Sequence, residues 1–231
     1  MSGVLAERYT SDQMRELWSR TYKIKAEREL WISVLKAQAK AGLEISDSVI
    51  ADYVKTKDVI DIASIDKREM VIKHDVKARI DEFNSLAGHQ KIHIGMTSRD
   101  LTENIEQLQI KESLKLVHDK TVATLSQLAK LATQYSDLAI TGRSHNVAAQ
   151  STTLGKRFAS AAEELLYAYE RLASLQGRYP MRGIKGPVGT AQDSIDLLGS
   201  TEAHQSLEAA IAKELGFDRV LDSTGQVYPR S

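Results

Sequence analysis

The chain has 231 residues, 42% of them hydrophobic and 27% charged, which is the balance of a globular protein with one large or two modest domains. Its 31 basic and 31 acidic residues cancel, so no overall charge favours nucleic acid or an anionic membrane as a partner. The absence of cysteine excludes disulfides and thiolate metal sites.

The first residues, MSGVLAERYTSDQM, lack the apolar core of a signal peptide, and no stretch of the sequence approaches membrane-spanning length. We therefore expect a cytoplasmic protein without a membrane partner. Of the three prolines the first is Pro180, so long uninterrupted helices can form before it.

Apolar residues at helical spacing predict three helices in the first part of the chain, over residues 11–41, 47–54 and 67–87. Ser11 or Thr10 is a suitable N-cap for the first helix, and Gly42 is expected to end it. The third helix is expected to end at Gly88.

After a polar loop, another helix is expected from Leu101 onward, with an apolar face that continues to Ala132. The cleanest pattern follows further along, where apolar residues keep a heptad spacing in the order Leu154, Phe158, Ala161, Leu165, Ala168, Leu172 and Leu175. A final helix is predicted over residues 200–215, and the only strand pattern is a short hairpin near 220–228. These elements predict an all-α fold: a small N-terminal helical domain (1–110), then a long-helix bundle (111–231) that is not completed.

One segment interrupts the helices, TGRSHNVAAQSTTLGKR from Thr141 to Arg157, and it contains the single histidine His145. In one interpretation it is a loop whose hydroxyl residues cap the next helix. In the other it is a ligand site, because Ser144 and its polar neighbours can hydrogen-bond a substrate while an imidazole transfers protons near neutral pH. The residues alone leave both interpretations open.

A second polar segment, KIHIGMTSRDLTEN, places Thr97 and Ser98 at the start of a helix, where amides and hydroxyls attract carboxylate or phosphate. The alternative is a capping box formed by Ser98 with Leu101 onward, or by Thr97 with Asp100. His89 and His93 have the i,i+4 spacing of metal ligands, but no acidic third ligand follows, so no metal site is expected.

Two further segments have simpler explanations. In VIKHDVKA, His74 lies on the polar helix face, where Asp75 can pair with Arg79 four residues on. GIKGPVGT lacks the Gly-Lys-Ser/Thr ending of a nucleotide-triphosphate loop and is interpreted as a bend between helices.

These segments also carry a resemblance. ERYT, KHDVKA, HIGMTSRDLTEN, GRSHNVAAQSTTLGKRFA and GIKGPVGTAQ occur in the order and spacing typical of the adenylosuccinate lyase family, within the aspartase/fumarase superfamily. The resemblance covers essentially the whole chain. It implies β-elimination of fumarate from purine nucleotide substrates, adenylosuccinate and the succinylcarboxamide ribotide, without a cofactor or metal.

Residue roles follow from the same resemblance. His145 matches the general acid, with Ser144 beside it where many relatives have threonine, and His74 lies near the substrate phosphate or the acid. The matching substrate-binding residues are Thr97 and Ser98 for the fumarate carboxylate, His93 nearby, Lys73 and Asp75 for the nucleotide, Arg8 and Tyr9 for the phosphate, and Gln226.

The sequence departs from the family pattern where it lacks the proline before the paired threonines, and above all where no Ser-Ser-x-Met-Pro-x-Lys-x-Asn motif supplies the base serine. We therefore expect an N-terminal portion of the enzyme, inactive by itself. The resemblance also implies a homotetramer whose sites combine three subunits. The alternatives are another fumarate-releasing enzyme such as argininosuccinate lyase, or a non-catalytic helical assembly module.

Overall fold

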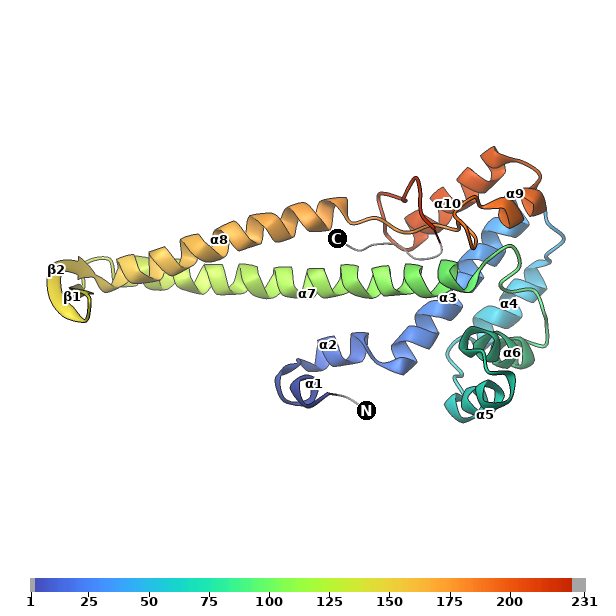
Figure 1. Ribbon diagram of the computed structural model, residues 1–231, viewed down its shortest axis with the longest axis horizontal. Helices are drawn as coiled ribbons and strands as arrows, with labels where there is room; N and C mark the ends of the chain where they lie inside the picture. Colours follow the sequence, from blue (N-terminus) through green and yellow to red (C-terminus); the bar gives the residue numbers. More distant parts are fainter. Residues whose placement is uncertain (1–2, 226–231) are drawn as a thin grey trace. The chain divides into compact units, whose positions relative to one another are not determined.

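The computed structural model describes residues 3–225, which contain ten helices and one two-stranded sheet (Figure 1). The described residues divide into two compact units. Unit 1 is formed by the residues up to Ile110 together with those from Tyr179 onward, and unit 2 by Lys111–Arg178. The almost entirely helical fold agrees with the sequence. However, the residues from Tyr179 onward, which were expected in the second domain, pack within unit 1.

Six short helices open unit 1: α1 (Val4–Tyr9), α2 (Asp12–Leu17), α3 (Arg20–Lys40), α4 (Asp47–Thr56), α5 (Ile62–Ile72) and α6 (Asp75–Ala87). The prediction of a single helix over 11–41 is wrong, because the chain turns at Trp18 and a new helix starts at Arg20. Ser11 accepts the Met14 amide at 3.3 Å, as predicted, but Ser19 then accepts the Tyr22 amide at 3.0 Å and caps α3.

The helix expected over 67–87 is also interrupted. Lys73 ends α5 in the left-handed conformation, with φ 59°, and His74 becomes the N-cap of α6 by accepting the Lys77 amide at 3.2 Å. A helix ends in this way most often at glycine, so lysine gave no signal of the break. At Gly88 the expected helix end is confirmed, with φ 75°.

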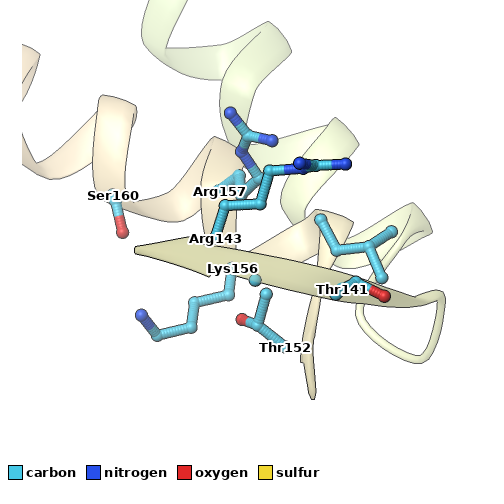
Figure 2. Close-up of a pocket in the computed structure, with 8 residues that line it drawn as sticks. Thr141, Arg143, Thr152, Lys156, Arg157 and Ser160 are labelled. Carbon is cyan, nitrogen blue, oxygen red and sulfur yellow. The ribbon is translucent and has the colours of Figure 1, made fainter. Parts of the chain in front are cut away.

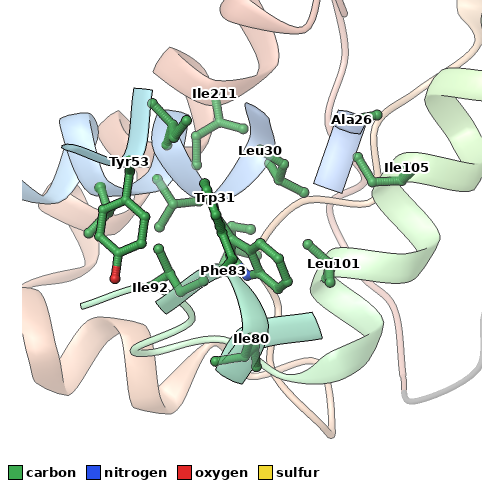
Figure 3. Packing of buried hydrophobic residues seen from close by; sticks show 14 of the residues in the cluster. Ala26, Leu30, Trp31, Tyr53, Ile80, Phe83, Ile92, Leu101, Ile105 and Ile211 are labelled. Carbon is green, nitrogen blue, oxygen red and sulfur yellow. The ribbon is translucent and has the colours of Figure 1, made fainter. Parts of the chain in front are cut away.

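Helix α3 supplies the centre of the unit 1 core (Figure 3). Trp31 lies 6.2 Å from Phe83 of α6 between ring centroids, and Tyr53 of α4 meets the same phenyl ring edge-on at 5.0 Å. Leu101 and Ile105, from the first turns of α7 (Ser98–Gln134), are fully buried in this cluster. Burial of each of these side chains contributes roughly 1.5–3 kcal/mol to folding.

Unit 1 is completed by α9 (Gln192–Leu198) and α10 (Thr201–Glu214). The second of these is the helix predicted over 200–215, whereas α9 was not predicted. Near the expected hairpin at 220–228, the described residues have only one parallel bridge, between Met181 and Val220. Residues from 226 onward lie outside the described part of the chain.

Unit 2 contains the rest of α7, strand β1 (Ala139–Ser144), strand β2 (Val147–Thr153) and helix α8 (Leu154–Arg178). The two helices run antiparallel side by side with the β-hairpin at their common end (Figure 1), and Tyr135 contacts Phe158 with ring centroids 6.1 Å apart. At Gly155 the helices approach so closely that a Cβ would lie 2.4 Å from the Ala132 carbonyl oxygen. The heptad helix is thus present as predicted.

The segment around His145, expected as a strandless loop, is an antiparallel β-hairpin. Its pairing runs from Ala139 opposite Thr153 to Ser144 opposite Val147, with a bulge between Thr141 and Arg143. Most side chains of both strands are exposed, so the sequence lacks the alternation of apolar and polar residues that identifies a strand.

The apolar heptad of α8 is only partly covered in the described structure. Leu165 and Leu172 are half-buried, Ala161 is exposed, and Gly155 is the only α8 residue among the described ones that is buried. In residues 3–225, no helix combines the length and apolarity needed to cross a membrane.

Candidate functional site

His145 occupies the tip of the hairpin. It forms a two-residue turn with Asn146, with φ 51° and 62° respectively, which is the type I′ arrangement that matches the twist of paired strands. Asparagine tolerates this left-handed conformation, but histidine does so at a cost that the strand pairing must offset. Arg143 supports the turn by donating to the Asn146 carbonyl at 3.1 Å. The geometry holds an exposed imidazole at a fixed point.

A pocket of about 480 Å³ opens beside the base of this hairpin (Figure 2). Its cationic lining residues are Arg143 from β1 with Lys156 and Arg157 from the first turn of α8. Its hydroxyl groups come from Thr141, Thr152 and Ser160. The lining includes no acidic residue, so unit 2 presents a positive, hydrogen-bonding concavity at the base of the hairpin.

In unit 1, His93 is held in a neutral form. The Trp31 indole donates to its Nδ1 at 3.0 Å, which leaves the proton on Nε2. Burial, helped by the positive charge of His74, lowers the pKa of His93 from 6.5 to about 4. The ring therefore offers a ligand an N–H donor rather than a charge at neutral pH. With a φ of 68°, His93 is a second histidine, after His145, in the left-handed backbone conformation.

His74 is a neighbour of His93 in this unit, close enough to influence its titration. The Nδ1 of His74 accepts the Lys77 amide as the cap of α6, so Nε2 carries the proton of the neutral ring. The predicted pair of Asp75 with Arg79 is confirmed at 3.1 Å, and Arg79 also reaches the buried Glu27 at 2.7 Å. These ion pairs fix the first turn of α6 and thereby the half-exposed His74 side chain.

Thr97 and Ser98 lie where α7 begins, as the sequence predicted. The Asp100 carboxylate accepts the Thr97 amide at 2.9 Å, which is half of the capping box weighed above. Within residues 3–225 neither the Thr97 nor the Ser98 hydroxyl forms a hydrogen bond. Both hydroxyls, with the positive end of the helix dipole, are thus available to a carboxylate.

Asp100 also holds the glycine-rich loop that sequence reasoning treated as a simple bend. Its fully buried carboxylate accepts the amides of Lys185 at 2.9 Å and Gly186 at 3.1 Å and pairs with the guanidinium of Arg182. Breaking a buried charge pair of this kind typically costs 3–5 kcal/mol. The partners lie more than eighty positions apart in the chain, so no local pattern could reveal them.

Lys185 is fixed on its other side as well, where its ammonium meets Glu208 of α10 at 2.7 Å. Glu208 also accepts the Ile184 amide at 2.8 Å. This buried network ties the loop to α7 and α10, and through Asp100 it orients the Thr97 backbone. Among the described residues, no group of three histidine or acidic side chains is arranged to hold a metal ion.

Comparison with known proteins places these features in a family. A family model described as "Lyase" matches residues 6–223. The chain belongs to this lyase family. Adenylosuccinate lyase of Saccharomyces cerevisiae is 32% identical over 98% of the chain, and that of Archaeoglobus fulgidus is 32% identical over 79%. The alignments cover 48% and 41% of those proteins, so the chain spans about half the length of the curated relatives it matches.

Solved structures agree at the level of the fold. The 3-carboxy-cis,cis-muconate lactonizing enzyme of Pseudomonas putida superposes with a TM-score of 0.82 at 18% identity, over 96% of this chain and 51% of that one. A fumarate lyase of Mesorhizobium sp. BNC1 gives 0.80 at 23% identity, over 93% and 50%. The helical fold of this lyase-family chain is therefore shared by a lactonizing enzyme and a fumarate lyase.

The lyase-family fold distributes the predicted site residues over both units. His74, Asp75 and His93 gather in unit 1, whereas Ser144 and His145 belong to unit 2. Arg8 and Tyr9 are exposed on α1, and among the described residues no hydrogen bond or ion pair joins them to His74 or His93. Lys73 borders a separate surface pocket with Asp66 and Glu69. Gln226 lies outside the described residues.

Proposed function

We propose that the protein acts as an adenylosuccinate lyase, eliminating fumarate from adenylosuccinate to give AMP and from the succinylcarboxamide ribotide to give AICAR. The observation that carries the proposal is the His145 hairpin, with a cationic, hydroxyl-lined pocket at its base, in a chain aligned over 98% of its length with an adenylosuccinate lyase. The substrates carry a phosphate and two carboxylates, the groups that such an arrangement can bind.

In this reaction a base removes a proton beside a succinyl carboxylate, and the negative charge that develops needs stabilisation by positioned donors. We assign that part to the open hydroxyls of Thr97 and Ser98 and to the N–H of neutral His93. The C–N bond then breaks and the departing amine takes a proton, which we assign to the exposed imidazole of His145, with Ser144 next to it in the chain. The family resemblance also assigns His74 to the acid or to the substrate phosphate.

The remaining assignments concern the nucleotide part of the substrate. Lys73 and Asp75 would contact the nucleotide, Arg8 and Tyr9 its phosphate, and Gln226 the substrate as well. The assignments of three of these residues are supported by their exposed side chains, which carry hydrogen-bond donors: Arg8, Tyr9 and Lys73.

The proposal leaves the catalytic base to a residue beyond these 231, because the serine-rich motif of the family does not occur among them. The 231 residues alone are thus expected to be inactive. We further propose a cytoplasmic homotetramer in which subunits complete each other's sites, supported by the partly covered apolar heptad of α8.

The test is fumarate release, followed by its ultraviolet absorbance, from the whole protein that contains this chain. We expect His145→Gln to lower kcat by roughly 100-fold or more, since a general acid contributes 10²–10⁴-fold. The control is His118→Gln on α7, an imidazole outside the assigned site, which should leave kcat unchanged. Unimpaired turnover by His145→Gln would remove His145 from the mechanism. Absence of fumarate release from the unmodified protein would favour a non-catalytic module. Turnover of argininosuccinate but not of adenylosuccinate would show that the proposed substrate is wrong.

A further inference from the structure

Two arginines at the base of the hairpin point their charged groups to the same place without a counter-charge. Arg143, Lys156 and Arg157 line the same pocket, and in the view of Figure 2 both guanidinium groups lie above the strand and the Lys156 ammonium below it. In the described residues none of the three forms an ion pair, and Arg143 makes only its bond to the Asn146 carbonyl. Like charges that line one pocket repel, so an anion bound between them would stabilise this arrangement.

The pocket fits a small ligand. Its volume of about 480 Å³ is within the usual range for small-molecule sites. Hydroxyls of Thr141, Thr152 and Ser160 stand around the cations and can donate to further oxygens of the same ligand. His145 is absent from this lining and from that of the adjoining pocket at Ser144 and Gln150. The cationic pocket is thus separate from the imidazole assigned as the acid.

We propose that this pocket binds a compact dianion, either a dicarboxylate or a phosphate, through charge-assisted hydrogen bonds from Arg143 and Arg157. A guanidinium donates two parallel N–H groups to such oxygens, and two guanidinium groups match the two negative charges. Lys156, which borders both pockets, adds long-range attraction from the other side of the strand. The same pocket supports the proposed function, but anion binding is measured here without turnover, so the titration and the fumarate-release assay can fail separately.

The experiment is isothermal titration of the protein at low ionic strength with two probes, inorganic phosphate and fumarate, in separate runs. We expect the anion that belongs to the pocket to bind about tenfold more weakly to Arg157→Gln, which removes one charge-assisted contact. The comparison of phosphate with fumarate identifies the source of the dianion. Arg171→Gln, also an exposed arginine of α8 but outside the pocket, is the matched control and should bind as the unmodified protein does.

Arg157 is the first choice because its side chain has no hydrogen-bond or ion-pair partner among residues 3–225, so we expect its loss to leave the fold intact. Arg143→Gln is the second variant and should lower the affinity for the same anion. Circular dichroism checks that its helices are retained. The proposal is overturned if neither anion binds, or if Arg157→Gln binds both as tightly as Arg171→Gln. A third outcome would also overturn the proposal: the unmodified protein binds neither anion, and Arg157→Gln sediments at a different rate. The arginines would then pair with acidic residues of a second copy of the chain.

Discussion

His93 combines an unusual backbone conformation with a buried, neutral ring, and both follow from one contact. The Trp31 indole donates to Nδ1 at 3.0 Å, and the two rings meet edge to face with centroids 6.0 Å apart. A proton on the Nδ1 of His93 would point towards the indole N–H of Trp31, so two donors would face each other and the hydrogen bond would break. Trp31, whose contact with His93 the sequence did not predict, thereby sets the charge of a residue assigned to the substrate site.

This contact makes stability depend on pH in a defined direction. The pKa of His93 is about 4 in the folded protein against 6.5 for the free side chain, so only the unfolded chain takes up this proton between those values. The free energy of unfolding should therefore fall as the pH drops from 6.5 towards 4, by about 1–2 kcal/mol between pH 7 and pH 5. His93→Asn, which tolerates the left-handed backbone, should remove that part of the slope.

The measurement is urea unfolding of both proteins at pH 7 and pH 5. Glu27 acts in the opposite sense, because burial raises its pKa to about 6 and its contribution grows as the pH falls through that value. Glu27 is present in both proteins, so the difference between their slopes isolates the imidazole. Equal slopes would show that His93 is not the neutral buried group described here.

At this scale the sequence identified chemistry but not contacts. Thr97, Ser98 and the Asp75–Arg79 pair were placed correctly because helix starts and i,i+4 pairs are local. The roles of Asp100 and Arg182 could not be predicted, since they depend on a loop brought back from more than eighty residues away. The assignments of His145 and Arg8 rest on family resemblance and remain predictions.

Among the elements, the antiparallel pair of α7 and α8 depends on one glycine. Gly155 lies in the first turn of α8, where a Cβ would lie 2.4 Å from the Ala132 carbonyl and 2.7 Å from that of Tyr135. The predicted helix 154–175 was correct, but nothing in the apolar pattern distinguished this glycine from Gly177, whose added Cβ would meet no atom within 4 Å.

The two glycines therefore form a matched pair. Gly155→Ala should lower the free energy of unfolding by roughly 1–3 kcal/mol, because backbone carbonyls must move to admit the methyl group. Gly177→Ala should raise it by about 0.5–1 kcal/mol, since alanine is the better helix former in open space. Thermal unfolding followed by circular dichroism measures both. A stabilising Gly155→Ala would mean that α7 and α8 are further apart at this point.

Breaks between helices were the weakest predictions at the element scale. Continuous apolar periodicity extended through Trp18 and Lys73, yet Ser19 and His74 capped new helices there. A cap acts through one side-chain bond to a backbone amide and needs no glycine or proline, so a break made by caps alone is easily missed.

For the whole molecule, the central question is what covers the apolar stripe of α8. The heptad predicted the helix correctly, and in the described structure its residues are half-buried, except for Ala161, which is exposed. A continuous stripe of this kind is typical of helices that pack lengthwise against further helices. The proposed self-association would cover it.

Sedimentation velocity tests this expectation. Leu165→Lys places a charge on the stripe and should shift the protein towards monomer, whereas Glu164→Lys, a neighbouring exposed position off the stripe, should leave the assembly unchanged. Helicity measured beside it separates lost assembly from lost folding. A monomeric unmodified protein at micromolar concentration would contradict the proposed homotetramer.

The two-residue turn at His145 also restricts how this segment can evolve. Ser144 pairs with Val147 directly below the turn, and the bulge near Gly142 already accommodates one irregularity in the ladder. Inserting or deleting a single residue in either strand would slip the register and move every following side chain to the opposite face. Substitutions among the exposed strand residues are therefore tolerable, but changes in length are not. We expect related sequences to align without gaps from Ala139 to Thr153, even where few of their residues are shared.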